Sequence, residues 1–214
     1  MNEKRLLLFL GGNHHDFAGF AATMSPVFRD AGYQVESSYE PDRLLRLRED
    51  QVDLVVMYTC LGSSRQGERI AEDLNPAQTE ALAGWVRAGG GLLAAHAATV
   101  IGEANTALRR LIGGRFVSHP PQFSFPVYPL YQGHPITEGI NSFSVFDEFY
   151  IENYDDGLEL HLAAFDRGVC HPMAWSKAEG QGRVAHIALG HGPAVWNLAP
   201  YQQLMRQAAD WLVS

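Results

Sequence analysis

The first half of the chain alternates continuous apolar segments with stretches whose apolar residues recur every three or four positions. The apolar run Arg5–Leu10, closed by Gly11-Gly12, predicts a buried strand. Helical spacing across Asp16–Ala31 predicts a helix that Gly32 ends. The same pattern predicts strands at Tyr33–Tyr39, Val52–Tyr58 and Leu92–Ala95, a short charged helix at Pro41–Glu49, and a helix from Asn75-Pro76 to Ala88. Strands alternating with helices over short connections predict a parallel sheet covered on both faces.

The second half has a different pattern. Phe116–Leu130 is rich in proline and aromatic residues, and shorter strand-like segments follow it. They are predicted at Phe143–Tyr154, Leu158–Phe165, Pro172–Ser176 and Arg183–Leu189, before a closing helix at Tyr201–Leu212. Because no linker rich in Pro, Gly or Ser divides the chain, we expect residues 1–214 to form a single domain.

Composition excludes several classes of partner. The chain has 24 acidic and 16 basic residues, a net charge of −8, which argues against nucleic acid or an anionic membrane as the partner. The two cysteines, Cys60 and Cys170, are too few for a disulfide scaffold and favour a reducing, cytoplasmic location. The apolar run Leu6–Leu10 is too short for a signal sequence or a membrane helix.

Several histidines follow predicted strands. In a parallel sheet the carboxyl ends of the strands form the binding edge, and His14, His15, Cys60 and His96 all fall at such ends. His96 is flanked by alanines in Ala94–Ala98, which is the pattern of a sharp strand-to-helix turn that exposes its central side chain. A histidine there is suited to metal binding, proton transfer or ligand binding, although a partly buried structural histidine gives the same pattern.

Three further motifs carry candidate chemistry. Gly190-His191-Gly192 places an imidazole in a tight turn after a strand, and His119-Pro120 restricts the backbone of a second histidine. In Asp147-Glu148, strand alternation predicts one carboxylate facing inward and one outward, without deciding which. An inward carboxylate near histidines would form a metal site or a general base. We interpret His161, His171 and His186 as core or surface residues, and Cys60 as a bystander.

The sequence contains no motif typical of nucleotide binding. The chain contains no G-x-x-x-x-G-K-[ST], no G-x-G-x-x-G after the first strand, no C-x-x-C and no H-E-x-x-H. We therefore expect no nucleotide cofactor.

Taken in order, the motifs resemble those of the trehalose-utilisation (ThuA-like) family. The matching segments are 11–15, 89–96, 114–120, 134–139, 147–150, 172–175, 182–184 and 189–191, which span nearly the whole chain. The resemblance implies an α/β fold like that of class I glutamine amidotransferases: a flavodoxin-like three-layer sandwich with a mostly parallel central sheet. His96 then takes the place of the amidotransferase cysteine, and His191 that of the catalytic histidine. With the cysteine gone, glutaminase activity is not expected.

The family resemblance also implies a role in carbohydrate metabolism and a small-molecule sugar as ligand. On that basis we assign catalysis to His96, His191 and Glu148, ligand binding to His14, His119, Asp147 and Tyr150, and a divalent metal such as zinc to His15, His96 and His191. The enzyme would depend on the metal or, without one, on the histidines themselves, and its reaction would be that of a sugar hydrolase, lyase or isomerase. Ala97 departs from the family, in which a small hydroxyl residue or a glycine commonly follows the histidine at the position of His96.

Two alternatives to the enzyme stay open. The chain could be a non-catalytic sugar-binding or sensing module that has kept the pocket of an amidotransferase-like scaffold. It could also act in an assembly, with the aromatic segment Pro120–Tyr131 as the surface of a homodimer.

Overall fold

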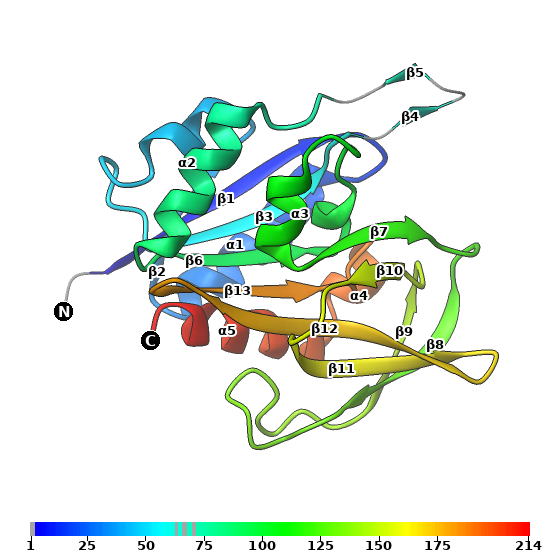
Figure 1. Cartoon of the computed structure of the whole chain (residues 1–214). Helices are drawn as coiled ribbons and strands as arrows, with labels where there is room; N and C mark the ends of the chain where they lie inside the picture. Colours follow the sequence, from blue (N-terminus) through cyan, green and yellow to red (C-terminus); the bar gives the residue numbers. More distant parts are fainter. Residues whose placement is uncertain (1–2, 63, 66–67, 70–71) are drawn as a thin grey trace.

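The centre of the molecule is a nine-stranded sheet, seen in a computed structural model that describes residues 3–62, 64–65, 68–69 and 72–214 (Figure 1). Its strand order is β2-β1-β3-β6-β13-β12-β11-β8-β9. The first five strands in this order pair in parallel, and the remaining pairs are antiparallel. Their bounds are β1 Lys4–Gly12, β2 Tyr33–Ser38, β3 Leu54–Cys60, β6 Gly91–Ala95, β8 Phe123–Pro129, β9 Phe143–Asp147, β11 Glu159–Asp166, β12 Val169–Glu179 and β13 Gly182–Ile187.

Helices cover the two faces of the sheet, which gives the three layers seen in Figure 1. Helices α1 (Phe17–Asp30), α4 (Pro193–Trp196) and α5 (Ala199–Leu212) pack with one core cluster. Helices α2 (Pro76–Arg87) and α3 (Thr106–Ile112) pack with the other. The chain thus has the mixed α/β architecture with a large, mostly parallel central sheet that the sequence predicts.

Local sequence explains where the main helices begin. Asp16 caps α1 by accepting the Gly19 N–H at 2.8 Å. At α2, the Asn75 side chain accepts the Gln78 N–H, and the Gln78 side chain accepts the Asn75 N–H, each at 2.9 Å. This capping box satisfies donors that the first helical turn would otherwise leave unpaired.

Two short sheets stand apart from the main one. β7 (Gly114–Ser118) pairs antiparallel with β10 (Ile151–Tyr154), and β4 (Ser64–Arg65) pairs antiparallel with β5 (Glu68–Arg69). The described residues also form two 3-10 helices, η1 (Pro41–Arg46) and η2 (His96–Thr99). Among the described residues, no helix is long and apolar enough to cross a membrane.

The structure corrects one sequence prediction in the second half. The segment Phe143–Tyr154 is not one strand, because β9 ends at Asp147 and the chain turns before β10 joins the separate sheet with β7. The aromatic segment Phe116–Leu130, for which the sequence predicted no element, contains most of β7 and all of β8.

Candidate active site

His96 occupies a strained turn directly after β6. Its φ is +46°, a left-handed conformation that is uncommon for residues other than glycine. The small neighbours Ala95 and Ala97 are fully buried and leave room for this turn. The His96 side chain is itself fully buried, and its Nδ1 lies 2.7 Å from Ala188 O. Because a carbonyl oxygen can only accept, the proton of the neutral ring lies on Nδ1, and Nε2 then has a lone pair.

His15 reaches the same place from the loop after β1. Its Nδ1 lies 3.1 Å from Asn13 O, so the same argument leaves the Nε2 lone pair available. The His15 ring centroid is 5.0 Å from that of His96 and 4.8 Å from that of His191. The neighbouring His14, with φ +70°, lines the adjoining cavity instead.

His191 is held by a carboxylate behind it. The fully buried Asp147 accepts the N–H groups of Gly190 at 2.7 Å and His191 at 3.0 Å. It also accepts the Glu148 N–H at 3.0 Å. Asp147 therefore fixes the turn that carries His191 and the backbone of Glu148.

Glu148 is the centre of the cluster. Its Oε2 lies 3.1 Å from His191 Nδ1 and 3.4 Å from His96 Nε2, and its Oε1 lies 3.6 Å from His119 Nε2. Ligand atoms of His15, His96, Glu148 and His191 all lie within 4.8 Å of one another. Four side chains from four separate segments thus converge on one point.

Three imidazole nitrogens of this cluster are buried without a well-aligned hydrogen bond in the described part of the chain: His15 Nε2, His96 Nε2 and His191 Nδ1. In two of the three rings, the opposite nitrogen is fixed by a backbone carbonyl. A metal-bound histidine is usually arranged in this way, because the fixed N–H sets the ring's direction. Three imidazoles with one carboxylate are a donor set suited to zinc, so the residues present fit such an ion.

The buried groups of the cluster shift one another's pKa values. Burial lowers the pKa of His15 to about 3, and the neighbouring His96 adds to this, so that His15 is neutral near pH 7. The Glu148 carboxylate raises the pKa of His191 against the effect of burial. Burial alone would raise the pKa of Glu148, but the imidazoles of His191 and His96 outweigh it and hold that pKa far below its usual range. Burial raises the pKa of Asp147, opposed by the nearby His96 and by the backbone N–H groups of Gly190, His191 and Glu148.

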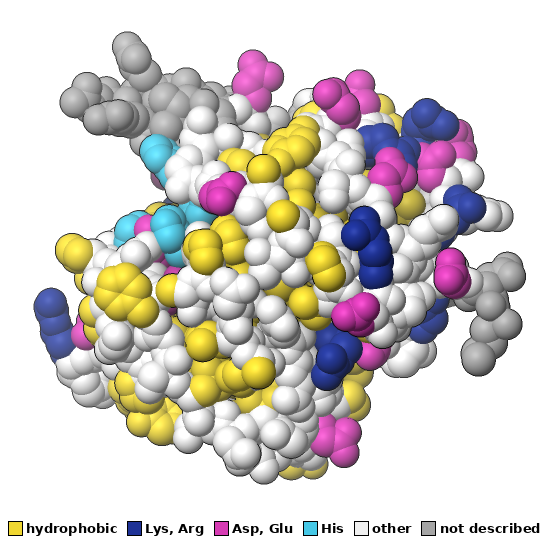
Figure 2. All heavy atoms as spheres, turned by 180° about the vertical axis from the view of Figure 1, so that it is seen from behind, with side chains coloured by type: hydrophobic (Ala, Val, Ile, Leu, Met, Phe, Trp, Pro, Cys, Tyr) yellow, Lys and Arg dark blue, Asp and Glu magenta, His cyan; other side chains and the backbone are white. Residues whose placement is uncertain are grey.

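A cavity of about 340 Å³ opens next to the cluster. Its lining residues are His14, His15, Cys60, Gly62, Val100, Phe116, His119, Glu148 and Tyr150. The space-filling view in Figure 2 shows histidine side chains gathered at a notch of the surface. Burial raises the pKa of Tyr150 well above its ordinary value, so its hydroxyl stays protonated.

The structure brings together nearly all the candidate residues of the sequence. His15 rather than His14 belongs to the four-residue cluster, and Glu148 rather than Asp147 presents its carboxylate to the histidines. The expected alternation fails here, since both carboxylates turn inward where β9 ends. Cys60 and Phe116 line the cavity although neither was selected as a site residue. Their positions, at the end of β3 and in β7, were the available signal.

A second group of ligand-type side chains, His134, Glu159 and His161, lies far along the antiparallel part of the sheet. Its geometry suits a metal less well. His134 Nδ1 accepts the Ile136 N–H at 3.1 Å, so in the neutral ring the proton is on Nε2, 3.8 Å from Glu159 Oε2. His161 Nε2 lies 2.7 Å from Ser176 Oγ. We interpret this group as structural.

The buried His161 gives the fold a pH dependence. Burial, with the nearby His134, lowers the pKa of His161 from 6.5 to about 4. Between these pH values the unfolded chain binds a proton at this residue and the folded chain does not, so the stability it contributes is present above pH 6.5 and lost as the pH falls toward 4. The full difference corresponds to about 3 kcal/mol.

The expected result is a free energy of unfolding that declines from pH 6.5 to pH 4.5, with a shallower decline in His161→Gln, which cannot titrate. Urea denaturation at several pH values measures both slopes. His15, whose pKa is also lowered, contributes to the decline in both proteins. Equal slopes in the two proteins would contradict the assignment.

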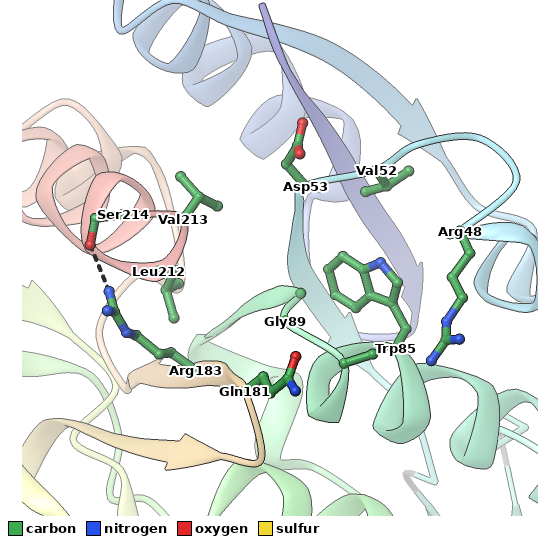
Figure 3. Close-up of a pocket in the computed structure, with 12 residues that line it drawn as sticks. Arg48, Val52, Asp53, Trp85, Gly89, Gln181, Arg183, Leu212, Val213 and Ser214 are labelled. Carbon is green, nitrogen blue, oxygen red and sulfur yellow. Dashed lines mark hydrogen bonds between the residues drawn. The ribbon is translucent and has the colours of Figure 1, made fainter.

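Larger cavities elsewhere lack this chemistry. One of about 470 Å³ lies at the amino-terminal ends of β3, β6 and β13, away from the strand ends that carry His96 and His191 (Figure 3). Arg183, which lines this cavity, donates a hydrogen bond from Nη1 to Ser214 Oγ at 2.6 Å. Its guanidinium carbon lies 5.0 Å from the centroid of the Trp211 ring. Another, of about 750 Å³, lies beside the N-termini of α2 and α3 and shares Gly62 with the site cavity.

Comparison with known proteins supports the fold described above. The family model described as trehalose utilisation (ThuA) matches residues 5–212. No curated protein matches the chain. Among solved structures, a ThuA-like protein of Parabacteroides merdae is similar with a TM-score of 0.82 and 17% identity, over 100% of this chain and 91% of that one.

Two further structures are similar in fold. A ThuA-like protein of Bacteroides uniformis has a TM-score of 0.76 and 18% identity, over 99% of this chain and 92% of that one. A protein of Salmonella typhimurium that is described as cytoplasmic has a TM-score of 0.66 and 14% identity, over 96% of this chain and 98% of that one. At these identities the similarity establishes the fold alone.

Proposed function

The chain belongs to the trehalose-utilisation (ThuA) family, and we propose that it is a metal-dependent enzyme acting on a trehalose-related disaccharide or keto-sugar. Family membership supports a role related to trehalose utilisation. The observation that carries the enzymatic proposal is the convergence of three imidazoles and the Glu148 carboxylate within 4.8 Å, beside an open cavity.

In this proposal His15, His96 and His191 hold the metal, together with Glu148. Once bound, a zinc-like ion would polarise a sugar carbonyl or make a bound water more acidic. By the family resemblance, His96 would take the place of an amidotransferase nucleophile. Its buried ring, fixed by a backbone carbonyl, favours imidazole ligation of a metal.

Proton transfer falls to Glu148 and His119 at the cavity. Glu148 presents Oε2 to His96 and His191 while its Oε1 faces His119. His119 Nδ1 lies 2.9 Å from the Pro120 carbonyl oxygen and so carries a proton. Its Nε2 lies 3.6 Å from Glu148 Oε1, beside the cavity. The pair can thus exchange a proton with a ligand bound there.

Aromatic rings give the cavity a wall suited to a sugar ring. Phe116 and Tyr150 both line it, with ring centroids 4.6 Å apart. An apolar sugar face can pack against such rings, and the protonated Tyr150 hydroxyl can donate a hydrogen bond. A volume of about 340 Å³ is at the small end of ligand sites, which suits one sugar ring inside and the remainder at the mouth.

The experiment is a product assay on protein loaded with zinc. Trehalose and its keto derivatives are incubated with wild type, with Glu148→Gln and with chelator-treated protein, and products are followed by NMR. We expect product with loaded wild type and none after chelation. In Glu148→Gln we expect the rate to fall at least about 100-fold. Sugar binding without product in loaded wild type would overturn the enzymatic proposal and support the binding module instead.

The setting of the activity is also proposed. A reducing cytoplasm is supported by similarity to the Salmonella protein described as cytoplasmic. A homodimer through the segment Pro120–Tyr131 is supported by the exposure of Tyr128, Leu130 and Tyr131, which light scattering over a concentration series would test.

A further inference from the structure

A buried polar network lies next to the strained turn at His96, which we call the elbow. His186 Nε2 is 3.1 Å from Glu152 Oε2, and both side chains are buried, at 0% and 2% exposure. The Thr99 hydroxyl donates to Glu152 Oε1 at 2.5 Å. None of these three residues lines the site cavity or belongs to the four-residue cluster.

The network pairs a buried histidine with a buried carboxyl group. His186 Nδ1 lies 2.9 Å from Ala94 O, and a carbonyl oxygen can only accept, so this nitrogen donates. The opposite nitrogen, Nε2, forms a hydrogen bond with Glu152 Oε2 at 3.1 Å. A buried pair of this kind adds little stability over apolar residues of similar size, so stability alone does not account for it.

The connections of the network indicate its role. Thr99 ends η2, the turn that begins at His96, and its hydroxyl also lies 3.4 Å from His96 O. Glu152 lies on β10, four residues after Glu148, and His186 lies on β13, five residues before His191. The network thus joins the three segments that carry His96, Glu148 and His191.

The elbow needs such support. A non-glycine residue at φ +46° persists only where the surroundings hold it, and strained positions of this kind are typical of functional sites. Ala94 O precedes His96 and receives His186, while Thr99 follows His96 and binds Glu152. The two anchor points therefore bracket the strained residue on both sides.

We propose that Thr99, Glu152 and His186 form a positioning network that holds the His96 backbone and so sets the direction of its Nε2. The inference deepens the proposed function, on which its effect on metal binding rests. The three residues are positioning residues, because they act through His96 and touch no ligand.

The test uses three variants. Thr99→Val keeps the shape of the side chain and removes the hydroxyl, Thr99→Ser keeps the hydroxyl, and Glu152→Gln removes the carboxylate. His161→Gln is the matched control, since it alters another buried histidine that contacts a hydroxyl, at Ser176. The first readout is amide hydrogen exchange in metal-free protein at Val100, whose N–H donates to Ala97 O at 2.9 Å across the elbow. The second is zinc affinity by chelator competition.

For Thr99→Val and Glu152→Gln we expect Val100 exchange to accelerate about 10-fold relative to amides of β1, and zinc affinity to fall about 10- to 100-fold. In Thr99→Ser and His161→Gln, the relative exchange rate of Val100 and the zinc affinity should both stay within about threefold of wild type. Equal acceleration of Val100 and β1 amides would indicate a merely structural role and overturn the inference. If wild type binds no zinc, the proposed function fails, and the metal-free exchange ratio still decides the positioning role.

Discussion

Replacing His96 with alanine is expected to lower zinc affinity about 100-fold or more and to abolish turnover. The reason is geometric. His96 Nε2 is fully buried, its ring is fixed by the Ala188 carbonyl, and no other described side chain nitrogen stands in its place within the cluster. The methyl group of alanine leaves the remaining ligands without a donor on the elbow side.

His134→Ala is the matched control, because it removes a buried histidine from the second group of ligand-type side chains. It should keep full zinc stoichiometry and turnover. Elemental analysis of protein purified without an affinity tag, combined with chelator competition, measures both variants. Metal retained in His96→Ala but lost in His134→Ala would mean that the wrong group has been assigned.

Replacing Asp147 with asparagine should affect both stability and the site. Asp147 accepts three backbone N–H groups, from Glu148, Gly190 and His191. An amide must present its NH₂ group to at least one of these donors, which leaves a buried N–H unpaired. We expect a loss of about 2 to 3 kcal/mol in the free energy of unfolding.

The same change should weaken zinc binding about 10-fold or more, because the turn that carries His191 loses its anchor. Urea denaturation and chelator competition measure the two effects. Asp166→Asn is the control. Among the described residues, its carboxylate pairs with the exposed Arg167 alone, at 4.0 Å, so the free energy of unfolding should change by less than about 0.5 kcal/mol. Wild-type zinc affinity in Asp147→Asn would show that the anchor does not position His191.

Parts of the fold and site follow from local sequence because local physics decides them. Alternating apolar strands and helices specify the parallel half of the sheet, and its carboxyl edge then gathers side chains that are distant in sequence. Alanines around His96 allow the strained turn, and Gly190, with φ +120°, allows the turn that precedes His191 after β13. These positions could be selected without coordinates.

Other features depend on tertiary context. Whether His14 or His15 enters the cluster depends on the φ of +70° at His14, which local sequence does not specify. The inward turn of both Asp147 and Glu148 depends on β9 ending where the chain leaves one sheet for another. His186 was interpreted as a core or surface residue because its side-chain partner, Glu152, is 34 positions away in the sequence.

The most direct test of the account is anomalous X-ray diffraction at the zinc edge, on crystals of untagged wild-type protein supplied with zinc. The account predicts a single strong peak bounded by His15 Nε2, His96 Nε2, His191 Nδ1 and the Glu148 carboxylate. A crystal with no peak at this position, or with its peak among His134, Glu159 and His161, would contradict it.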